Sequence, residues 1–215
     1  MPQVKITSLK LINTRKELYR ATLDNGESSE LDAEIVLQRG VAAGVEFDER
    51  EWEELLRENE LRLARKNGVA YVALGLKPSG QVRSYLINKG FSEDAVEHTL
   101  DHLTQRGYVN DAEYAARTVE LRLHNGGKGP TKVRAELKAK GIPEELLDRA
   151  VPPLEEAEWQ RQAAIKLAEK KFKTERETDP VKLKAKMYRF LAGRGFHSEA
   201  IHAAIDAWME QRRSE

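Results

Sequence analysis

Three stretches of the sequence set the fold: RSYLINKGFSEDAVEHTLDHL (83–103), RAELKAKGIPEELLDRAVPPL (134–154) and YRFLAGRGFHSEAIHAAIDAW (188–208). They align on a tripeptide in which a basic residue and a glycine precede an apolar residue, at offsets of 51 and 54 residues. Apolar residues recur at the matched positions, as at Leu86 and Leu137. Self-similarity at a fixed period near 50 residues is typical of arrays in which each unit is one supersecondary motif.

Each repeat is predicted to hold three helices. The glycine ends the second helix in a left-handed cap, and the apolar residue after it precedes the N-cap of the third helix. Ser92 is the predicted N-cap in the first repeat, and Asn110 with Glu113 forms a capping box that opens the second. The first helix of repeat 1 is expected over residues 59–76, and Gly68 inside it costs about 1 kcal/mol relative to alanine.

Residues 4–31, ahead of the repeats, show the alternation of β-strands. The Asp-Asn-Gly tripeptide at 24–26 is typical of a hairpin turn, because Asn and Gly tolerate positive φ. A short helix is expected over 32–39, and a capping box at 48–51 starts the helical part.

The predicted fold is therefore mainly α: three tandem three-helix repeats in an elongated curved array, preceded by a small N-terminal β-hairpin and helix module. The predicted divisions are 1–57 for the N-terminal module, 58–109 for repeat 1, 110–153 for repeat 2 and 154–215 for repeat 3.

The composition excludes several classes of protein. The chain has 215 residues, no cysteine, 40% hydrophobic residues and a mean hydropathy of −0.64. Without cysteine there is no disulfide framework, thiolate nucleophile or zinc ribbon. No apolar run approaches the ~20 residues of a membrane span, and the N-terminus lacks the apolar segment of a signal peptide. We expect a cytoplasmic protein with no membrane partner.

The net charge of zero comes from 36 basic and 36 acidic residues that are unevenly placed. Residues 1–57 hold 12 acids and 8 bases, net −4, whereas 117–140 has a net charge of +5 and 161–194 one of +7. Such asymmetry says more about partners than the total does. Lysine-rich helix faces are also ordinary solvated surface, and that interpretation stays open for each window.

Basic residues in repeats 2 and 3 are predicted to form one surface for an anionic partner. Lys182, Lys186 and Arg189 follow i, i+4, i+7 spacing beside an apolar stripe. Apart from Tyr188, aromatic residues do not interleave with the bases, so backbone contact without sequence readout is expected. The candidate residues are Arg117, Arg122, Lys128, Lys132, Arg134, Lys138, Lys182, Lys186 and Arg189.

Motifs for catalysis are weak. His98 and His102 have the i, i+4 spacing of metal ligands, but they lie off the predicted buried face and lack a third convergent ligand. The loop at 124–131 superficially resembles a phosphate cradle, yet it fails the P-loop spacing, follows a helix and contains Pro130. We expect no enzyme, no catalytic residue, no metal and no cofactor.

The stretches 89–115 and 122–142 resemble the RecX family of bacterial regulators of the RecA recombinase. The motifs that carry the resemblance include Lys89-Gly90-Phe91, Gly107-Tyr108-Val109-Asn110-Asp111 and Lys128-Gly129-Pro130. The resemblance implies a curved, elongated protein that lodges in the groove of a RecA filament on DNA. It also implies inhibition of filament extension, ATP hydrolysis and strand exchange in recombinational repair and the SOS response.

The partners expected on this reading are the RecA filament and single- and double-stranded DNA, bound weakly and without sequence specificity by a monomer. The acidic module would meet a basic patch on the recombinase or on the chain's own repeats. Two other classes stay open. One is a stand-alone DNA-binding helical-repeat protein, because three-helix units also occur in helix-turn-helix readers. The other is a helical interaction scaffold without nucleic acid.

Overall fold

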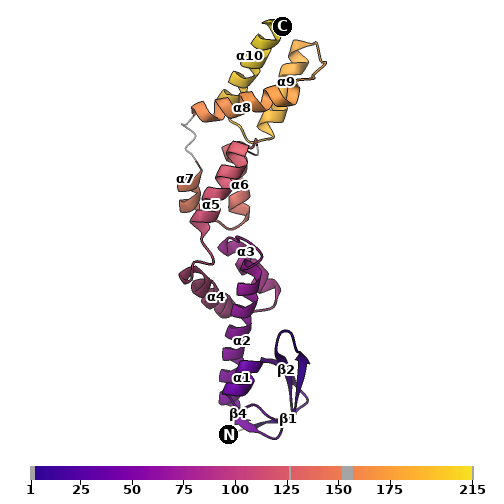
Figure 1. Ribbon diagram of the computed structural model, residues 1–215, viewed down its shortest axis with the longest axis vertical. Coiled ribbons are helices and arrows are strands. Elements are labelled where there is room, and N and C mark those ends of the chain that lie inside the picture. Colours follow the sequence, from indigo (N-terminus) through magenta and orange to yellow (C-terminus); the bar gives the residue numbers. More distant parts are fainter. Residues whose placement is uncertain (1–2, 126, 152–156, 215) are drawn as a thin grey trace. The chain divides into compact units, whose positions relative to one another are not determined.

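The computed structural model divides the chain into two compact units, which we describe separately (Figure 1). The first unit comprises Met1–Leu76 and Val82–Val109, and the second comprises Lys77–Gln81 and Asn110–Glu215. The residues that the structure describes are 3–125, 127–151 and 157–214.

An antiparallel sheet in the order β3-β2-β1-β4 opens the first unit. Its strands are β1 (Gln3–Asn13), β2 (Leu18–Leu23), β3 (Ser28–Asp32) and β4 (Glu46–Asp48). The predicted hairpin turn joins β2 to β3, where the N–H of Leu23 donates to the carbonyl of Glu27 at 2.8 Å. The short strand β4 was not predicted, because three residues are too few for an alternation pattern.

Two helices cover this sheet, α1 (Ala33–Gln38) and the long α2 (Glu49–Val72) (Figure 1). The Asp48 side chain accepts from the N–H of Glu51 and the Glu51 side chain accepts from the N–H of Asp48, which confirms the capping box. Phe47 packs on Trp52 across it, with ring centroids 5.8 Å apart. This cap fixes where α2 begins.

The prediction that the first helix of repeat 1 starts near residue 59 is wrong, because α2 already begins at Glu49. Asn59 is instead a buried residue of α2. Its side-chain oxygen accepts from the N–H of Asp32 at 2.8 Å, and its side-chain nitrogen donates to the carbonyl of Glu30 at 2.9 Å. The division expected between residues 57 and 58 falls inside α2, which serves both the sheet module and repeat 1.

Repeat 1 continues with α3 (Ser79–Asn88) and α4 (Glu93–Gln105). Ser92 is the N-cap of α4, as predicted, and its hydroxyl accepts from the N–H of Ala95. Gly68 lies on the face of α2 that packs against α4. A Cβ at this position would lie 2.8 Å from Cγ2 of Thr99 and 3.2 Å from Cδ1 of Leu103. The residue read from the sequence as a weak point is therefore a position of close helix packing.

The second unit holds repeats 2 and 3. Asn110 caps its first helix by accepting from the N–H of Glu113 at 3.0 Å. The division predicted at 153/154 and the matched residue Leu154 lie outside the described residues. The helices of this unit are α5 (Asp111–Val119), the π-helical segment η1 (Glu120–Asn125), α6 (Pro130–Ala139), α7 (Glu144–Ala150), α8 (Ala157–Phe172), α9 (Pro180–Ala192) and α10 (Ser198–Ser214).

The glycine turn is the same in all three repeats, as its sequence predicts. Gly90, Gly141 and Gly195 have φ of +89°, +81° and +85°. In each turn the N–H of the next residue donates to a carbonyl five residues back, at 3.2–3.3 Å, as in Phe91 to Leu86. This is the Schellman arrangement that a left-handed glycine permits. The matched apolar residues form the core of each repeat, among them Leu86, Leu137 and Leu191, each 0% exposed.

Candidate functional site

The predicted basic residues lie on several elements of the second unit. Those of repeat 2 lie on α5, on η1, on the loop after it and on α6, and those of repeat 3 lie on α9. Their side chains are largely engaged within their own repeats. Seven of the nine predicted residues contact a carboxylate, and the other two, Lys132 and Arg189, donate to backbone carbonyls.

Glu136 forms ion pairs with two of the predicted basic residues. Lys128 Nζ lies 2.6 Å from one carboxylate oxygen of Glu136, and Arg122 lies 3.2 Å from the other. The hydrogen bond from Lys128 lowers the pKa of Glu136 below its ordinary value, and the charges of Lys128 and Arg122 add to the effect. Because the Lys128 side chain is only 24% exposed, we assign it a structural role in holding the loop to α6.

Arg134 joins α6 to α7. It contacts Glu144 and lies 2.6 Å from Asp148, and these two hydrogen bonds raise the pKa of its guanidinium. Lys138 Nζ also approaches Glu144, at 3.4 Å. The hydrogen bond from Arg134 lowers the pKa of the Glu144 carboxyl. Arg134 could reach a phosphate only by leaving two carboxylates.

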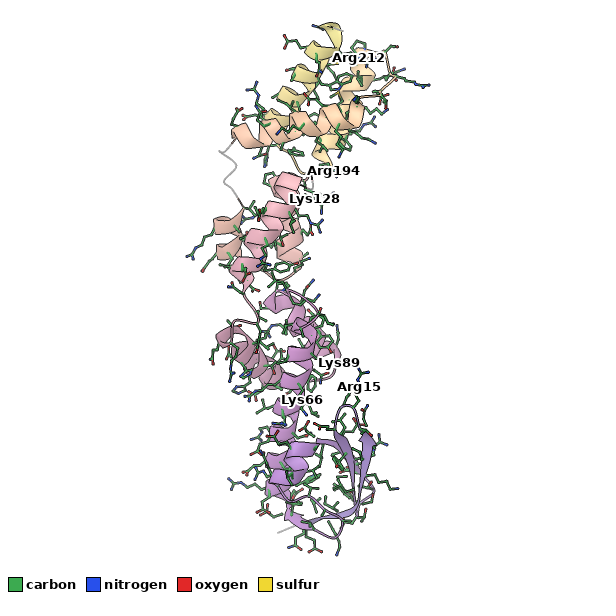
Figure 2. The ribbon with its side chains drawn as sticks, viewed as in Figure 1. Arg15, Lys66, Lys89, Lys128, Arg194 and Arg212 are labelled. Atoms are coloured by element: carbon green, nitrogen blue, oxygen red, sulfur yellow. The ribbon has the colours of Figure 1, made fainter. Side chains whose placement is uncertain are left out.

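The loop that superficially resembled a phosphate cradle uses its amides inside the protein. The N–H of Lys128 donates to the carbonyl of Arg122 at 3.1 Å, and the N–H of Gly129 donates to the carbonyl of Arg194 at 2.8 Å. Figure 2 shows Lys128 and Arg194 next to each other at this junction. The backbone amides of these two residues are therefore not available to a phosphate partner. The side chain of His124 lies outside the described part of the chain.

The remaining predicted residues form exposed, exchangeable contacts. Lys182 and Lys186 lie 3.9 Å from Asp179 and 2.7 Å from Glu175, and their side chains are 73% and 53% exposed. Arg117 pairs with Glu113 at 2.7 Å. Exposed pairs such as those of Lys182 and Arg117 contribute about 0–1 kcal/mol, so a phosphate can replace the carboxylate at little cost. The carboxylate that pairs with Lys186, Glu175, is only 16% exposed. That these residues form one continuous surface stays a prediction.

A basic pocket between α8 and α10 was missed by the sequence analysis. It has a volume of about 600 Å³, and Lys166, Lys170 and Lys173 line it at i, i+4, i+7 spacing. None of the three forms an ion pair within the described residues. The i, i+4, i+7 spacing of these lysines is present in the sequence of residues 161–194. The prediction placed the basic surface on α9 instead, because an apolar stripe lies beside Lys182 there.

Arg212 completes this pocket from α10. Its guanidinium carbon lies 5.2 Å from the Trp208 ring centroid, an arrangement that holds the charge in place by cation–π attraction. Its Nη1 atom is buried and has no hydrogen-bond partner among the described residues. Glu169 and Glu175 also line the pocket, and Glu175 is held by Lys186. Three lysines that form no ion pair in the described part of the chain, beside the Arg212 guanidinium, fit a phosphate or carboxylate ligand.

The histidine pair has the surroundings of exposed helix surface. His98 Nε2 lies 3.6 Å from Asp94, and the His98 side chain is 56% exposed. Within the described residues, no group of three or more His, Cys, Asp or Glu side chains could hold a metal ion. Within the same residues, no helix is both long enough and apolar enough to cross a membrane.

Comparisons with known proteins point to one family. Two family models match the second unit: one described as the second three-helix domain of RecX matches residues 110–151, and one described as the third matches 158–205. The chain is 27% identical over 203 residues to the regulatory protein RecX of Clostridium perfringens (strain SM101 / Type A), covering 94% of each chain. It is 28% identical over 200 residues to that of Bacillus licheniformis, covering 93% of this chain and 76% of the relative.

A solved structure supports the same relationship over almost the whole chain. The crystal structure of a regulatory protein RecX matches with a TM-score of 0.64 and 25% identity, over 94% of this chain and 99% of that one. The match therefore includes the N-terminal sheet module as well as the repeats.

Proposed function

The chain belongs to the RecX family, and on this premise we propose that it is a regulatory protein that binds the RecA recombinase filament on DNA. Bound there, it restrains ATP hydrolysis, filament extension and strand exchange in recombinational repair and the SOS response. It acts by binding and carries out no chemistry of its own. The observation that carries the proposal is the match of repeats 2 and 3 to the second and third RecX domains.

The basic residues of repeats 2 and 3 support a contact with DNA phosphates. Among the described residues, Lys166, Lys170, Lys173 and Arg212 at the pocket between α8 and α10 form no ion pair, so they can bind phosphate without first losing a carboxylate. The exposed lysines of α9 add contacts that exchange a weak ion pair for a phosphate. Such contacts follow the backbone and read no sequence, which fits a filament formed on any DNA.

The test is a titration of the DNA-dependent ATPase of the matching RecA recombinase with the full chain, alongside the affinity of the chain for DNA alone. We expect suppression at amounts below one chain per recombinase, and weak, salt-sensitive DNA binding. Tight, sequence-selective DNA binding with an unchanged ATPase would instead establish a stand-alone DNA-binding protein. Absence of both effects would favour a scaffold without nucleic acid.

A charge-reversal variant locates the effect. Replacing Lys182, Lys186 and Arg189 by Glu should weaken inhibition of the ATPase and reduce its dependence on salt. The matched control reverses three exposed bases of the first unit, Lys10, Arg50 and Arg57, and changes the net charge equally. Inhibition that is equally weakened in both variants would indicate a general charge effect and would overturn a specific contribution of the α9 bases.

A further inference from the structure

Two pairs of neighbouring repeats share one kind of contact. In each pair, the first turn of the second helix of one repeat packs against the glycine turn of the next repeat. Gly80, in the first turn of α3, approaches Gly141 so closely that an added Cβ on Gly141 would lie 2.8 Å from the Gly80 Cα. The N-cap of α6, Gly129, donates its N–H to the carbonyl of Arg194, beside Gly195. In both contacts a glycine in the arriving turn lets one backbone reach another.

The third glycine turn, at Lys89-Gly90, has the same conformation, but no described helix packs its first turn against it. Its φ of +89° matches the +81° and +85° of Gly141 and Gly195. No described residue has an atom within 4 Å of the position of a Cβ on Gly90. Likewise, no described residue donates to the carbonyl of Lys89, the counterpart of the Arg194 carbonyl that accepts from Gly129. Repeat 1 thus presents a glycine turn of the same conformation, with its Lys89 carbonyl in the position where the Arg194 carbonyl of repeat 3 accepts from Gly129.

A basic cleft borders this turn. It has a volume of about 520 Å³ and is lined by Lys89 and Phe91 together with Lys66 of α2 and Arg15 and Lys16 of the β1–β2 turn. Figure 2 shows Arg15, Lys66 and Lys89 around the same region of the first unit.

The free charge of the cleft is positive. Two acidic residues, Glu17 and Glu30, also line the cleft. Lys66 lies 2.6 Å from the buried Asp32 and 3.8 Å from Glu17, and Glu30 lies 3.0 Å from Arg20, so the acids are paired with bases other than Arg15, Lys16 and Lys89. Arg15, Lys16 and Lys89 form no ion pair within the described chain. The first turns of α3 and α6 carry no acidic residue, and a helix N-terminus itself has a partial positive charge, so a helix that docks here must bring acidic side chains in its first turn to match this charge.

A second copy of this chain is a poor occupant. The second helix of repeat 3, α9, begins at Pro180 after its N-cap Asp179 and has no glycine in its first turn. Its exposed residues just beyond are Lys182, Lys184 and Lys186, which repel the basic cleft. Charge and backbone geometry therefore both favour a different protein.

We propose that the Lys89-Gly90 turn and its basic cleft are a docking site for the N-terminal turn of an α-helix of the recombinase. That turn carries a glycine at the closest approach and acidic side chains facing Arg15, Lys16 and Lys89. The inference rests on the proposed function for the identity of the partner. It separates a protein contact in repeat 1 from the DNA contacts of repeats 2 and 3.

The test compares Gly90→Asn and Lys89→Glu with the control Gly107→Asn. Asn tolerates positive φ, and its side chain at residue 90 would occupy the space of the arriving backbone. Gly107 also has a positive φ, +72°, with nothing within 4 Å, so the control carries the same backbone strain. Binding of each full chain is measured to a preformed recombinase filament on single-stranded DNA and to the same DNA alone.

We expect both site variants to bind the filament about tenfold more weakly and to bind DNA alone as the unmodified chain does, with Gly107→Asn unchanged in both assays. The Lys89→Glu variant leaves the glycine in place and serves if Gly90→Asn fails to fold. Filament binding by both site variants equal to that of the unmodified chain would overturn the docking site and leave the proposed function standing. Failure of the unmodified chain to bind the filament would overturn both.

Discussion

Gly68 lies where α2 packs on α4, and the space there is smaller than a methyl group. A Cβ would lie 2.8 Å from Cγ2 of Thr99, a fully buried side chain that has no room to move away. Alanine is favoured over glycine in a helix by about 1 kcal/mol, whereas overpacking a core costs about 1–3 kcal/mol. We therefore expect Gly68→Ala to lower the free energy of unfolding of the first unit, by about 1 kcal/mol, in urea titrations followed by circular dichroism.

The matched control is the double variant Gly68→Ala with Thr99→Ser, which removes the methyl group that the new Cβ would meet. Its loss of stability should be smaller than the sum of the losses of the two single variants, because the residues are in contact. A Gly68→Ala protein more stable than the unmodified chain would show that helix propensity outweighs packing at this position.

Glu136 makes repeat 2 sensitive to acid. Its pKa is lowered in the folded state, chiefly by the hydrogen bond from Lys128, so its contribution is complete above the unfolded pKa of about 4.5 and is lost as pH falls through the lower folded pKa. We expect Glu136→Gln to cost about 1 kcal/mol at pH 7 and almost nothing at pH 2, measured by urea unfolding at both pH values. The control Glu120→Gln, at an exposed acid without an ion pair in the described chain, should cost little at either pH. An equal cost for Glu136→Gln at both pH values would contradict the assignment.

At the scale of elements, α2 connects the sheet module to repeat 1. Asp32, the N-cap of α1, is 0% exposed and lies 2.6 Å from both Arg62 and Lys66 of α2. Farther along, the same helix packs on α4 through Gly68. Because α2 belongs to both parts, a substitution that destabilises the sheet module should also destabilise repeat 1.

We expect Asp32→Ala to cost about 3 kcal/mol, because it removes a cap and leaves two cations without their buried carboxylate. Amide hydrogen exchange should become faster in α4 as well as in β3 and α1. The control Asp101→Ala, at an exposed acid of α4, should leave exchange in β3 unchanged. Faster exchange confined to β3 and α1 would show that the module opens independently of repeat 1.

Features set by neighbouring residues in the chain were predictable from the sequence. The glycine turns, the caps at Asp48, Ser92 and Asn110, and the hairpin turn all depend on local spacing and are present. Strand β4, the continuation of α2 through Asn59 and the ion pairs of Arg134 depend on residues far apart in the sequence. No local sequence pattern indicates these features. The basic side chains of repeat 2 are therefore more often paired with carboxylates than the sequence predicts.

For the molecule as a whole, zero net charge results from two kinds of cancellation. The acidic residues 1–57 offset the basic windows of the repeats, and most of the predicted basic residues in repeats 2 and 3 are also paired one by one. Within the described residues of repeat 3, Lys166, Lys170, Lys173 and Arg212 form one group of bases without ion pairs around the pocket between α8 and α10. Weak, localised attraction to phosphate follows, without the strong indiscriminate DNA binding of a uniformly basic protein.

This arrangement predicts different salt dependences for two sets of residues. Each phosphate contact on single-stranded DNA contributes about −0.7 to the slope of log K against log salt. We expect Lys166, Lys170 and Lys173, all replaced by Gln, to make the slope shallower by about 2 in DNA-binding titrations over a range of salt. Replacing Lys182, Lys186 and Arg189 by Gln should change it less. A lysine that leaves a carboxylate to reach a phosphate exposes that carboxylate to solution cations, so the net release of ions is smaller. A larger change for the α9 set than for the α8 set would place the principal DNA contact on α9.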